Sequence, residues 1–252
     1  LNISTASSLL IASLGIPVAK HGNRAMSGNS GSADVLEELG VNITINPKKV
    51  EECINEIDIS FMFAQSFHPA MKYAAPLRKE IGLRNIFHFL GPLTNPASVK
   101  KQIIGTTNKD FAKKIAEAAK ILKSERIITL SGISGADEIE IDNKTIFYDS
   151  KNSFIEENID FEIKKYDSKY LIVQSPKDSA KKILNTFKAT SQSNDIEKKS
   201  IEHSIIINAA MALYLCDYNN KFSECYDIAK ENIYNGKVLK KLNQLIEFTN
   251  RK

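Results

Sequence analysis

The sequence predicts an α/β protein with a mixed or parallel central sheet flanked by helices. The first observation is an alternation of helical patterns with short apolar runs from residue 2 to residue 130, which is typical of strands joined by helical crossovers. The second is the carboxyl-terminal part, which has helical patterns from residue 177 onward. Its run at 196–215 has an almost wholly apolar face, so we expect this helix at the centre of the core.

Composition and charge are those of an ordinary globular protein. The 252 residues are 42% hydrophobic and 25% charged, and the net charge of +4 is spread along the chain. This pattern argues against a dedicated nucleic-acid or membrane surface. We expect neither a membrane span nor a signal peptide. Cys53, Cys216 and Cys225 lie in apolar helical patterns, which indicates buried thiols in a reducing, cytoplasmic compartment.

Caps and periodicity predict the elements of the amino-terminal part. Asn2 or Ser4 is a suitable N-cap for a mostly apolar helix, and Pro47 fits the first turn of another. A buried strand then leads into the segment that carries His68. The expected elements are helices at 2–14, 34–39, 47–57 and 69–81 and strands at 17–19 and 59–64.

The later elements follow from the same patterns. Gly91-Pro92 and Asn95-Pro96 predict a tight loop of fixed shape that borders a cleft. Residues 139–148 alternate, which predicts short strands, and residues 151–176 predict loops and edge strands. The remaining expected elements are strands at 101–106 and 126–130 and helices at 110–122, 177–189, 196–215, 222–234 and 237–248.

Residues 20–40 have the features of a phosphate-binding loop before a helix. Glycines allow backbone N–H groups to approach a ligand closely, and Ser30 or Ser32 can cap the helix, whose N-terminus favours an anion. Lys20 and Arg24 add full positive charges. The same spacing also fits an ordinary strand–loop–helix connection with surface cations, so both interpretations stay open at this point.

Three further positions carry candidate chemistry. His68 follows a buried strand, where α/β sheets bind ligands, although such a histidine is also typical of capping and packing. Asp137 and Glu138 follow another strand in a glycine loop and offer paired oxygens that suit Mg²⁺, although a solvated acidic turn has the same pattern. Arg78 is either a surface cation or a planar fork for a carboxylate.

Five separated motifs occur together and in order along the chain. They are NIST (2–5), KHGNRAMSGNSGSADVLEELG (20–40), HPAMK (68–72), LRKEIGLRNIFHFLGPLTNP (77–96) and GADEI (135–139), with NAA at 208–210. In this combination, which extends over essentially the whole chain, the sequence resembles the anthranilate phosphoribosyltransferases of tryptophan biosynthesis. The resemblance implies an α/β domain with a small helical domain, a homodimer, Mg²⁺ as cofactor, and 5-phosphoribosyl 1-pyrophosphate (PRPP) and anthranilate as substrates.

The resemblance also implies a division of the chain and two sets of binding residues. Residues 1–65 and 97–252 would form the α/β domain, and residues 66–96 the helical-domain segment with a hinge loop. Ser4, Asp137 and Glu138 match the metal-binding residues. The residues that would hold PRPP are Asn2, Ser4, Thr5, Lys20, His21, Gly22, Asn23, Arg24, Ser27, Gly28 and Ser32.

A third set concerns the acceptor. Asn23, His68 and Arg78 match positions that contact anthranilate, and Arg78 would hold its carboxylate. The implied reaction transfers the phosphoribosyl group to the aromatic amine and releases pyrophosphate. Because an aryl amine is neutral at pH 7, no residue is assigned as an obligatory base.

Three alternatives remain open on the sequence. A pyrimidine nucleoside phosphorylase shares the general architecture and would bind inorganic phosphate and a nucleobase. A catalytically silent relative could bind nucleic acid, and a fragment or degenerate copy could fold without activity. The family has a Gly-Thr-Gly-Gly-Asp loop upstream of NIST, and since the chain starts at Leu1 without Met, we expect a segment with this loop to precede it.

Overall fold

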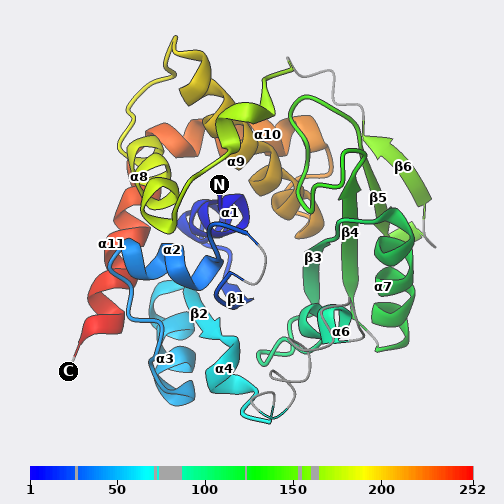
Figure 1. The fold of residues 1–252 in the computed structure, drawn as a ribbon, viewed down its shortest axis with the longest axis horizontal. Coiled ribbons are helices and arrows are strands. Elements are labelled where there is room, and N and C mark those ends of the chain that lie inside the picture. Colours follow the sequence, from blue (N-terminus) through cyan, green and yellow to red (C-terminus); the bar gives the residue numbers. More distant parts are fainter. Residues whose placement is uncertain are drawn as a thin grey trace.

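Two separate sheets and a body of helices make up the protein (Figure 1). The computed structural model describes residues 1–25, 28–70, 73, 87–122, 124–152, 155–159 and 165–251. The predicted α/β class is confirmed, although the described strands pair in two sheets where the sequence predicts one. No helix in these ranges has the length and apolarity that crossing a membrane requires.

The smaller sheet carries the predicted phosphate loop. Its two strands are parallel, with Lys20 of the first opposite Phe61 of the second. Because parallel strands end at the same edge of a sheet, the loop after Gly22 and the segment around His68 lie at one end. The elements of this part are β1 (Val18–Gly22), α2 (Ser32–Glu38), α3 (Pro47–Ile57), β2 (Ile59–Phe63) and α4 (Ala64–Phe67).

The helical body surrounds α1 and contains the largest core. Leu9 and Leu10 of α1 are fully buried in the same cluster as Ile205 of α9 and Leu245 of α11. α1 contacts α9, α10 and α11 and also β1 (Figure 1). Burial of so many branched side chains fixes the position of α1, whose amino terminus therefore has a defined place. The helices of this body are α1 (Ile3–Ser13), α8 (Pro176–Phe187), α9 (Ile196–Leu215), α10 (Phe222–Tyr234) and α11 (Lys237–Asn250).

The larger sheet has the strand order β3-β4-β5-β6, with β3 and β4 parallel and the later pairs antiparallel. α7 packs on one face, where Ile115 meets Ile127, and α9 packs on the other, where Met211 meets Ile128. β4 is buried along its whole length, as expected for a strand covered on both faces. The elements are β3 (Lys101–Gly105), α7 (Lys109–Ile121), β4 (Arg126–Gly132), β5 (Thr145–Asp149), the 3₁₀ turns η1 (Ser150–Asn152) and η2 (Ser168–Leu171), and β6 (Ile155–Ile159).

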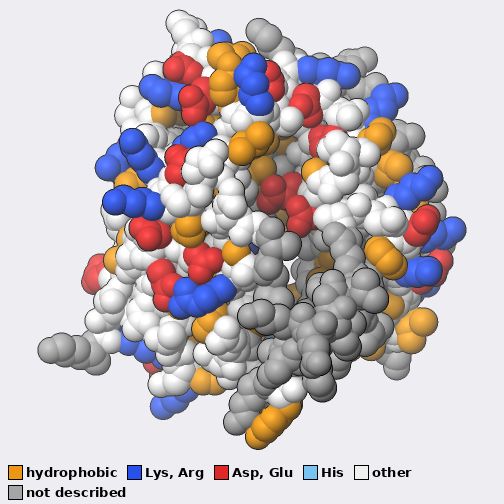
Figure 2. Space-filling view, viewed as in Figure 1, with side chains coloured by type: hydrophobic (Ala, Val, Ile, Leu, Met, Phe, Trp, Pro, Cys, Tyr) orange, Lys and Arg blue, Asp and Glu red, His pale blue; other side chains and the backbone are white. Residues whose placement is uncertain are grey.

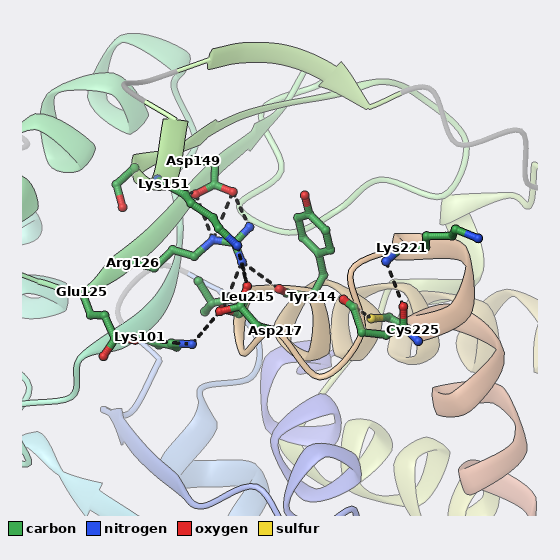
Figure 3. Close-up of polar contacts among 12 residues, drawn as sticks. Lys101, Glu125, Arg126, Asp149, Lys151, Tyr214, Leu215, Asp217, Lys221 and Cys225 are labelled. Carbon is green, nitrogen blue, oxygen red and sulfur yellow. Dashed lines mark hydrogen bonds and ion pairs between the residues drawn. The ribbon is translucent and has the colours of Figure 1, made fainter.

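A network of ion pairs and hydrogen bonds fixes the end of α9 to the larger sheet (Figure 3). The buried Arg126 guanidinium lies 2.5 Å from an Asp149 oxygen and 3.1 Å from an Asp217 oxygen. It also donates to the Tyr214 and Leu215 carbonyls at 2.9 and 3.2 Å. These carbonyls belong to the last turn of α9, where the helix dipole favours a cation. α9 therefore joins the helical body to the larger sheet.

Three segments differ from their predictions. Residues 87–93 form helix α6 (Phe87–Leu93) where a tight loop was expected, with Pro92 in its last turn. The strand predicted at the start of 139–148 is wrong, because the N–H groups of Ile139 and Glu140 donate to side chains and not to a neighbouring strand. The helix expected at 69–81 falls mainly outside the described residues.

Candidate active site

The amino terminus of α1 meets the acidic loop that follows β4. The Ser4 N–H donates to Glu138 Oε1 at 3.0 Å, across 134 positions of sequence. Asn2 occupies the predicted N-cap position, but its side chain accepts a hydrogen bond from the Thr5 hydroxyl and not from a backbone N–H. Asn2 is thus the N-cap residue, as one of the two predicted alternatives, but its side chain does not cap the helix; a carboxylate from the distant loop accepts a first-turn N–H instead.

Lys20 reaches the same place from β1. Its Nζ donates to Ser4 Oγ at 3.1 Å, and it interacts electrostatically with Glu138. Three of the predicted motifs, NIST, the Lys20 loop and GADEI, thus converge although they are far apart in sequence. Figure 2 shows acidic side chains in the middle of this face, between the helical body and the larger sheet.

Burial shifts the titration of both charged groups at this point. Removal from water lowers the pKa of the Lys20 ammonium to about 8, and the nearby Glu138 opposes this shift. Burial also raises the pKa of the Glu138 carboxyl to about 7, with repulsion from Asp137 as the second cause. The Ser4 N–H and Lys20 act in the opposite direction. Near neutral pH the Glu138 carboxyl is therefore only partly ionised, and a further cation at this point would favour its ionised form.

The acidic loop is fixed by close packing against β3. A Cβ on Gly105 would lie 1.6 Å from the Asp137 carbonyl oxygen, so only glycine fits at the end of this strand. Glu140 closes the loop by accepting hydrogen bonds from the Ser134 N–H and hydroxyl at 2.8 and 2.6 Å. Asp137 and Glu138 are thereby held on a loop with a defined backbone path.

The donor set at this loop fits a hard divalent cation. Asp137 is exposed and Glu138 is half-buried, and their repulsion would be relieved by a cation between them. Within the described ranges, no group of three or more His, Cys, Asp or Glu side chains could hold a metal ion. A cation here would therefore take its remaining ligands from the Ser4 hydroxyl, water or substrate oxygens, as is common for Mg²⁺.

The glycine loop after β1 is held by one carboxylate. Asp34 accepts hydrogen bonds from the Gly31 N–H at 3.1 Å and the Ala25 N–H at 2.9 Å. The predicted cap by Ser30 or Ser32 is wrong, because Gly31 is the N-cap residue and Asp34 closes the first turn. Because α2 is only seven residues long and a carboxylate already closes its first turn, the N-terminus of α2 does not serve as an anion-binding site.

Arg24 lies at the edge of this loop and is paired in the structure. Its guanidinium is 3.0 Å from Asp34 and 2.5 Å from Glu37, and it stacks over the Phe63 ring. These hydrogen bonds raise its pKa above the usual range. The carboxylates of α2 therefore orient Arg24, which is exposed, and a phosphate would have to compete with them for its N–H groups.

Other predicted residues of the loop have structural partners. The Asn23 carbonyl accepts the Ser32 hydroxyl and the Ala33 N–H, both at 3.3 Å. Gly22 is required for close packing, since a Cβ there would lie 2.3 Å from Ser32 Oγ. Gly28 is exposed, with open space where a side chain would be. Ser27 and Arg78, predicted for PRPP and anthranilate, fall outside the described residues.

Two histidines face each other at the ends of β1 and β2. The rings of His21 and His68 have centroids 5.0 Å apart in an edge-to-face arrangement. In the described part of the protein, the Nε2 atoms of both rings are buried without a hydrogen-bond partner. Burial, and then His68, lowers the pKa of His21, so this ring stays neutral near pH 7. Two adjacent rings, each with a buried Nε2 that lacks a partner among the described residues, suit an aromatic or hydrogen-bonding ligand.

Sequence reasoning missed the residues that hold the acidic loop. Asn208 accepts the Ile139 N–H, and Gly105 provides space for the loop. The sequence offered two signals: Gly105 at the carboxyl end of a strand, and Asn208 as a polar residue within an apolar helix. Neither pattern indicates its partner, because both contacts join segments distant in sequence.

Comparisons with known proteins agree with this geometry. Residues 1–239 match the family model described as "Glycosyl transferase family, a/b domain". The chain is 42% identical to the anthranilate phosphoribosyltransferase of Alkaliphilus metalliredigens, covering 98% of this chain and 72% of the relative. It is 43% identical to that of Saccharolobus islandicus, covering 97% and 69%.

Solved structures give the same result. The anthranilate phosphoribosyltransferase of Thermus thermophilus superposes with a TM-score of 0.90 at 30% identity, covering 99% of this chain and 74% of that one. The enzyme of Saccharomyces cerevisiae in complex with PRPP and Mg shares the fold, with a TM-score of 0.89 at 24% identity over 98% and 69% of the two chains. From the family model, the sequence relatives and the shared fold, the chain belongs to the anthranilate phosphoribosyltransferase family.

Proposed function

We propose that this chain transfers the phosphoribosyl group of PRPP to the amine of anthranilate, giving N-(5-phosphoribosyl)anthranilate and pyrophosphate. The observation that carries the proposal is the convergence of Lys20, Ser4 and Glu138 at the amino terminus of α1. A cation, a helix N-terminus and a carboxylate pair together suit a pyrophosphate that is bound with a metal ion.

PRPP would lie between α1, the loop after β1 and the acidic loop. Lys20 would donate to phosphate oxygens from its place beside Ser4. The loop after β1 would add further backbone N–H groups, and Arg24 lies at its edge. The residues proposed to hold PRPP remain Asn2, Ser4, Thr5, Lys20, His21, Gly22, Asn23, Arg24, Ser27, Gly28 and Ser32.

Asp137, Glu138 and Ser4 would hold Mg²⁺. The PRPP and Mg in the yeast structure are bound to that protein, and the proposal for this chain depends on its own paired carboxylates. When bound, the ion would stabilise negative charge on the departing pyrophosphate. Lys20 would share this charge, in a site where burial strengthens electrostatic interactions.

Anthranilate would lie near Asn23, His68 and Arg78, with the Arg78 fork on its carboxylate. The amine nitrogen forms a bond to the anomeric carbon as the bond from that carbon to pyrophosphate breaks, and the nitrogen then loses a proton to solvent. The aryl amine is neutral at pH 7, so holding it in place is the main requirement. His68 is proposed as a positioning group beside His21.

We also propose that the protein works as a cytoplasmic homodimer, with residues 1–65 and 97–252 as the α/β domain and 66–96 as the helical-domain segment. Three free cysteines, Cys53, Cys216 and Cys225, support a reducing compartment.

A fluorescence assay of anthranilate consumption with PRPP and Mg²⁺ tests the proposed function. We expect turnover that requires both PRPP and Mg²⁺. In Lys20→Ala the rate should fall at least about 100-fold, because the cation that stabilises the departing pyrophosphate is lost. Lys48→Ala is the matched control. Lys48 is an exposed lysine whose ion pair with Glu52 is long, at 4.0 Å, so its removal should leave the rate unchanged. Phosphorolysis of a pyrimidine nucleoside without anthranilate turnover would contradict the proposal.

A further inference from the structure

We propose that Asn208 on α9 is a positioning residue for the divalent cation site, acting through the backbone of the acidic loop. The proposal rests on the function proposed above, in which Asp137 and Glu138 hold the cation. Asn208 is not a ligand itself. One of its two side-chain hydrogen bonds is to the peptide group that follows Glu138.

The oxygen and the nitrogen of the Asn208 side-chain amide each form a hydrogen bond. Oδ1 accepts a hydrogen bond from the Ile139 N–H at 3.1 Å. Nδ2 donates to the Ser204 carbonyl of the preceding turn of α9 at 2.9 Å. The second bond orients the amide, so that its oxygen faces the loop. Asn208 therefore presents one acceptor at a fixed point on a helix that packs against the larger sheet.

The peptide group held by Asn208 determines where Glu138 points. The Ile139 N–H belongs to the same planar unit as the Glu138 carbonyl, so fixing it fixes the backbone that carries the carboxylate. On the other side, the Asp137 carbonyl packs against Gly105 of β3. The Ile139 side chain is 2% exposed and packs with Ile207 and Met211 of α9. The acid pair is thus held between a strand and a helix.

Loss of the amide would leave the Ile139 N–H without its acceptor next to a buried side chain. The loop would have to turn to satisfy this donor, and the carboxylates would move with it. Residues that orient metal ligands in this way typically contribute 10–100-fold to metal affinity. We therefore assign Asn208 an effect of about this size on cation binding.

The test is the affinity for Mn²⁺ alone, measured by electron paramagnetic resonance on the whole chain. We expect Asn208→Leu, which keeps the branched shape without the hydrogen-bonding groups, and Asn208→Ser, which is smaller, to weaken Mn²⁺ binding about 10–100-fold. Hydrogen exchange of the Ile139 amide should accelerate in both variants. Thr129→Val is the matched control, because it removes a buried side-chain bond of the same sheet, Thr129 Oγ1 to the Ala112 carbonyl at 2.8 Å, away from the acidic loop.

A double-mutant cycle separates positioning from a general loss of stability. In an Asp137→Asn background, the Asn208→Leu effect on Mn²⁺ affinity should largely disappear, because one of the groups that it aligns is gone. Equal Mn²⁺ affinity in wild type and Asn208→Leu would overturn this inference while leaving the proposed cation site intact. Absence of Mn²⁺ binding in the wild type would instead overturn the cation site itself.

Discussion

At the scale of single residues, the site is built from charges that are partly removed from water. Lys20 and Glu138 are both shifted toward their neutral forms by burial. Each has only part of the counter-charge that its ionised form requires. A ligand that brings both an anion and a divalent cation would compensate both groups at once, and this matches the charge pattern of PRPP with Mg²⁺.

A second buried group is expected to make the free energy of unfolding depend on pH in the acidic range. His203 on α9 is 4% exposed, bonds to the Tyr226 hydroxyl at 2.8 Å and packs on Tyr166. Burial lowers its pKa to about 4, and Lys230 acts in the same direction. The unfolded chain takes up this proton near pH 6.5 and the folded chain only near pH 4. The contribution of His203 to the free energy of unfolding is therefore constant above pH 6.5 and falls by about 3 kcal/mol as the pH drops to 4.

Urea unfolding at pH 7 and pH 4 measures this effect. His203→Gln keeps a polar partner for Tyr226 and cannot titrate, so it should lose about 3 kcal/mol less than wild type over this range. The neighbouring Glu202 acts with the opposite sign, since burial raises its pKa, but it is present in both proteins and cancels. Equal losses in the two proteins would show that His203 titrates normally in the folded state.

At the scale of elements, α9 links the two halves of the molecule. Its middle packs on α1 and on the larger sheet, and its last turn is fixed by Arg126. Asp149→Asn removes the negative charge nearest to Arg126, whose side chain is 4% exposed. Arg126 would keep Asp217 at 3.1 Å, but this carboxylate is 38% exposed and leaves the buried guanidinium only partly compensated, so we expect a loss of up to about 3–5 kcal/mol in the free energy of unfolding.

Urea unfolding measures this loss in the free energy of unfolding and compares it with that of an exposed ion pair. Glu52→Gln removes a carboxylate from the surface pair with Lys48 and should cost less than about 1 kcal/mol, as exposed ion pairs do. If the two substitutions had similar effects, the Arg126 network would not be what fixes α9 to the sheet.

At the scale of the whole molecule, local patterns predict elements well and their assembly poorly. The helices α3, α9 and α10 have the bounds that periodicity predicts, because each has a clear apolar face or cap. The helix α6 was missed, since Gly91 and Pro92 within it favour a loop. The division into two sheets was missed as well, because strand pairing depends on contacts between distant segments.

The same limit applies to the site. Each motif by itself fits a plain structural role, such as the acidic turn at Asp137 and Glu138 or the cations at Lys20 and Arg24. The N-cap position of Asn2 in α1 was predicted, but the acceptor of the Ser4 N–H was not, because it comes from residue 138. The order of several motifs, more than any one of them, predicted the family, and the fold then explained why Ser4, Lys20 and Glu138 meet.

The most direct test of this account is a calorimetric titration of PRPP, with and without Mg²⁺, on the wild type and on Asp137→Asn. The account predicts that Mg²⁺ strengthens PRPP binding to the wild type at least about 10-fold, because Asp137 and Glu138 would hold the ion and its charge would offset that of the pyrophosphate. In Asp137→Asn most of this gain should disappear while binding without Mg²⁺ changes little. A gain of equal size in both proteins would contradict the assignment of the acidic loop as the cation site.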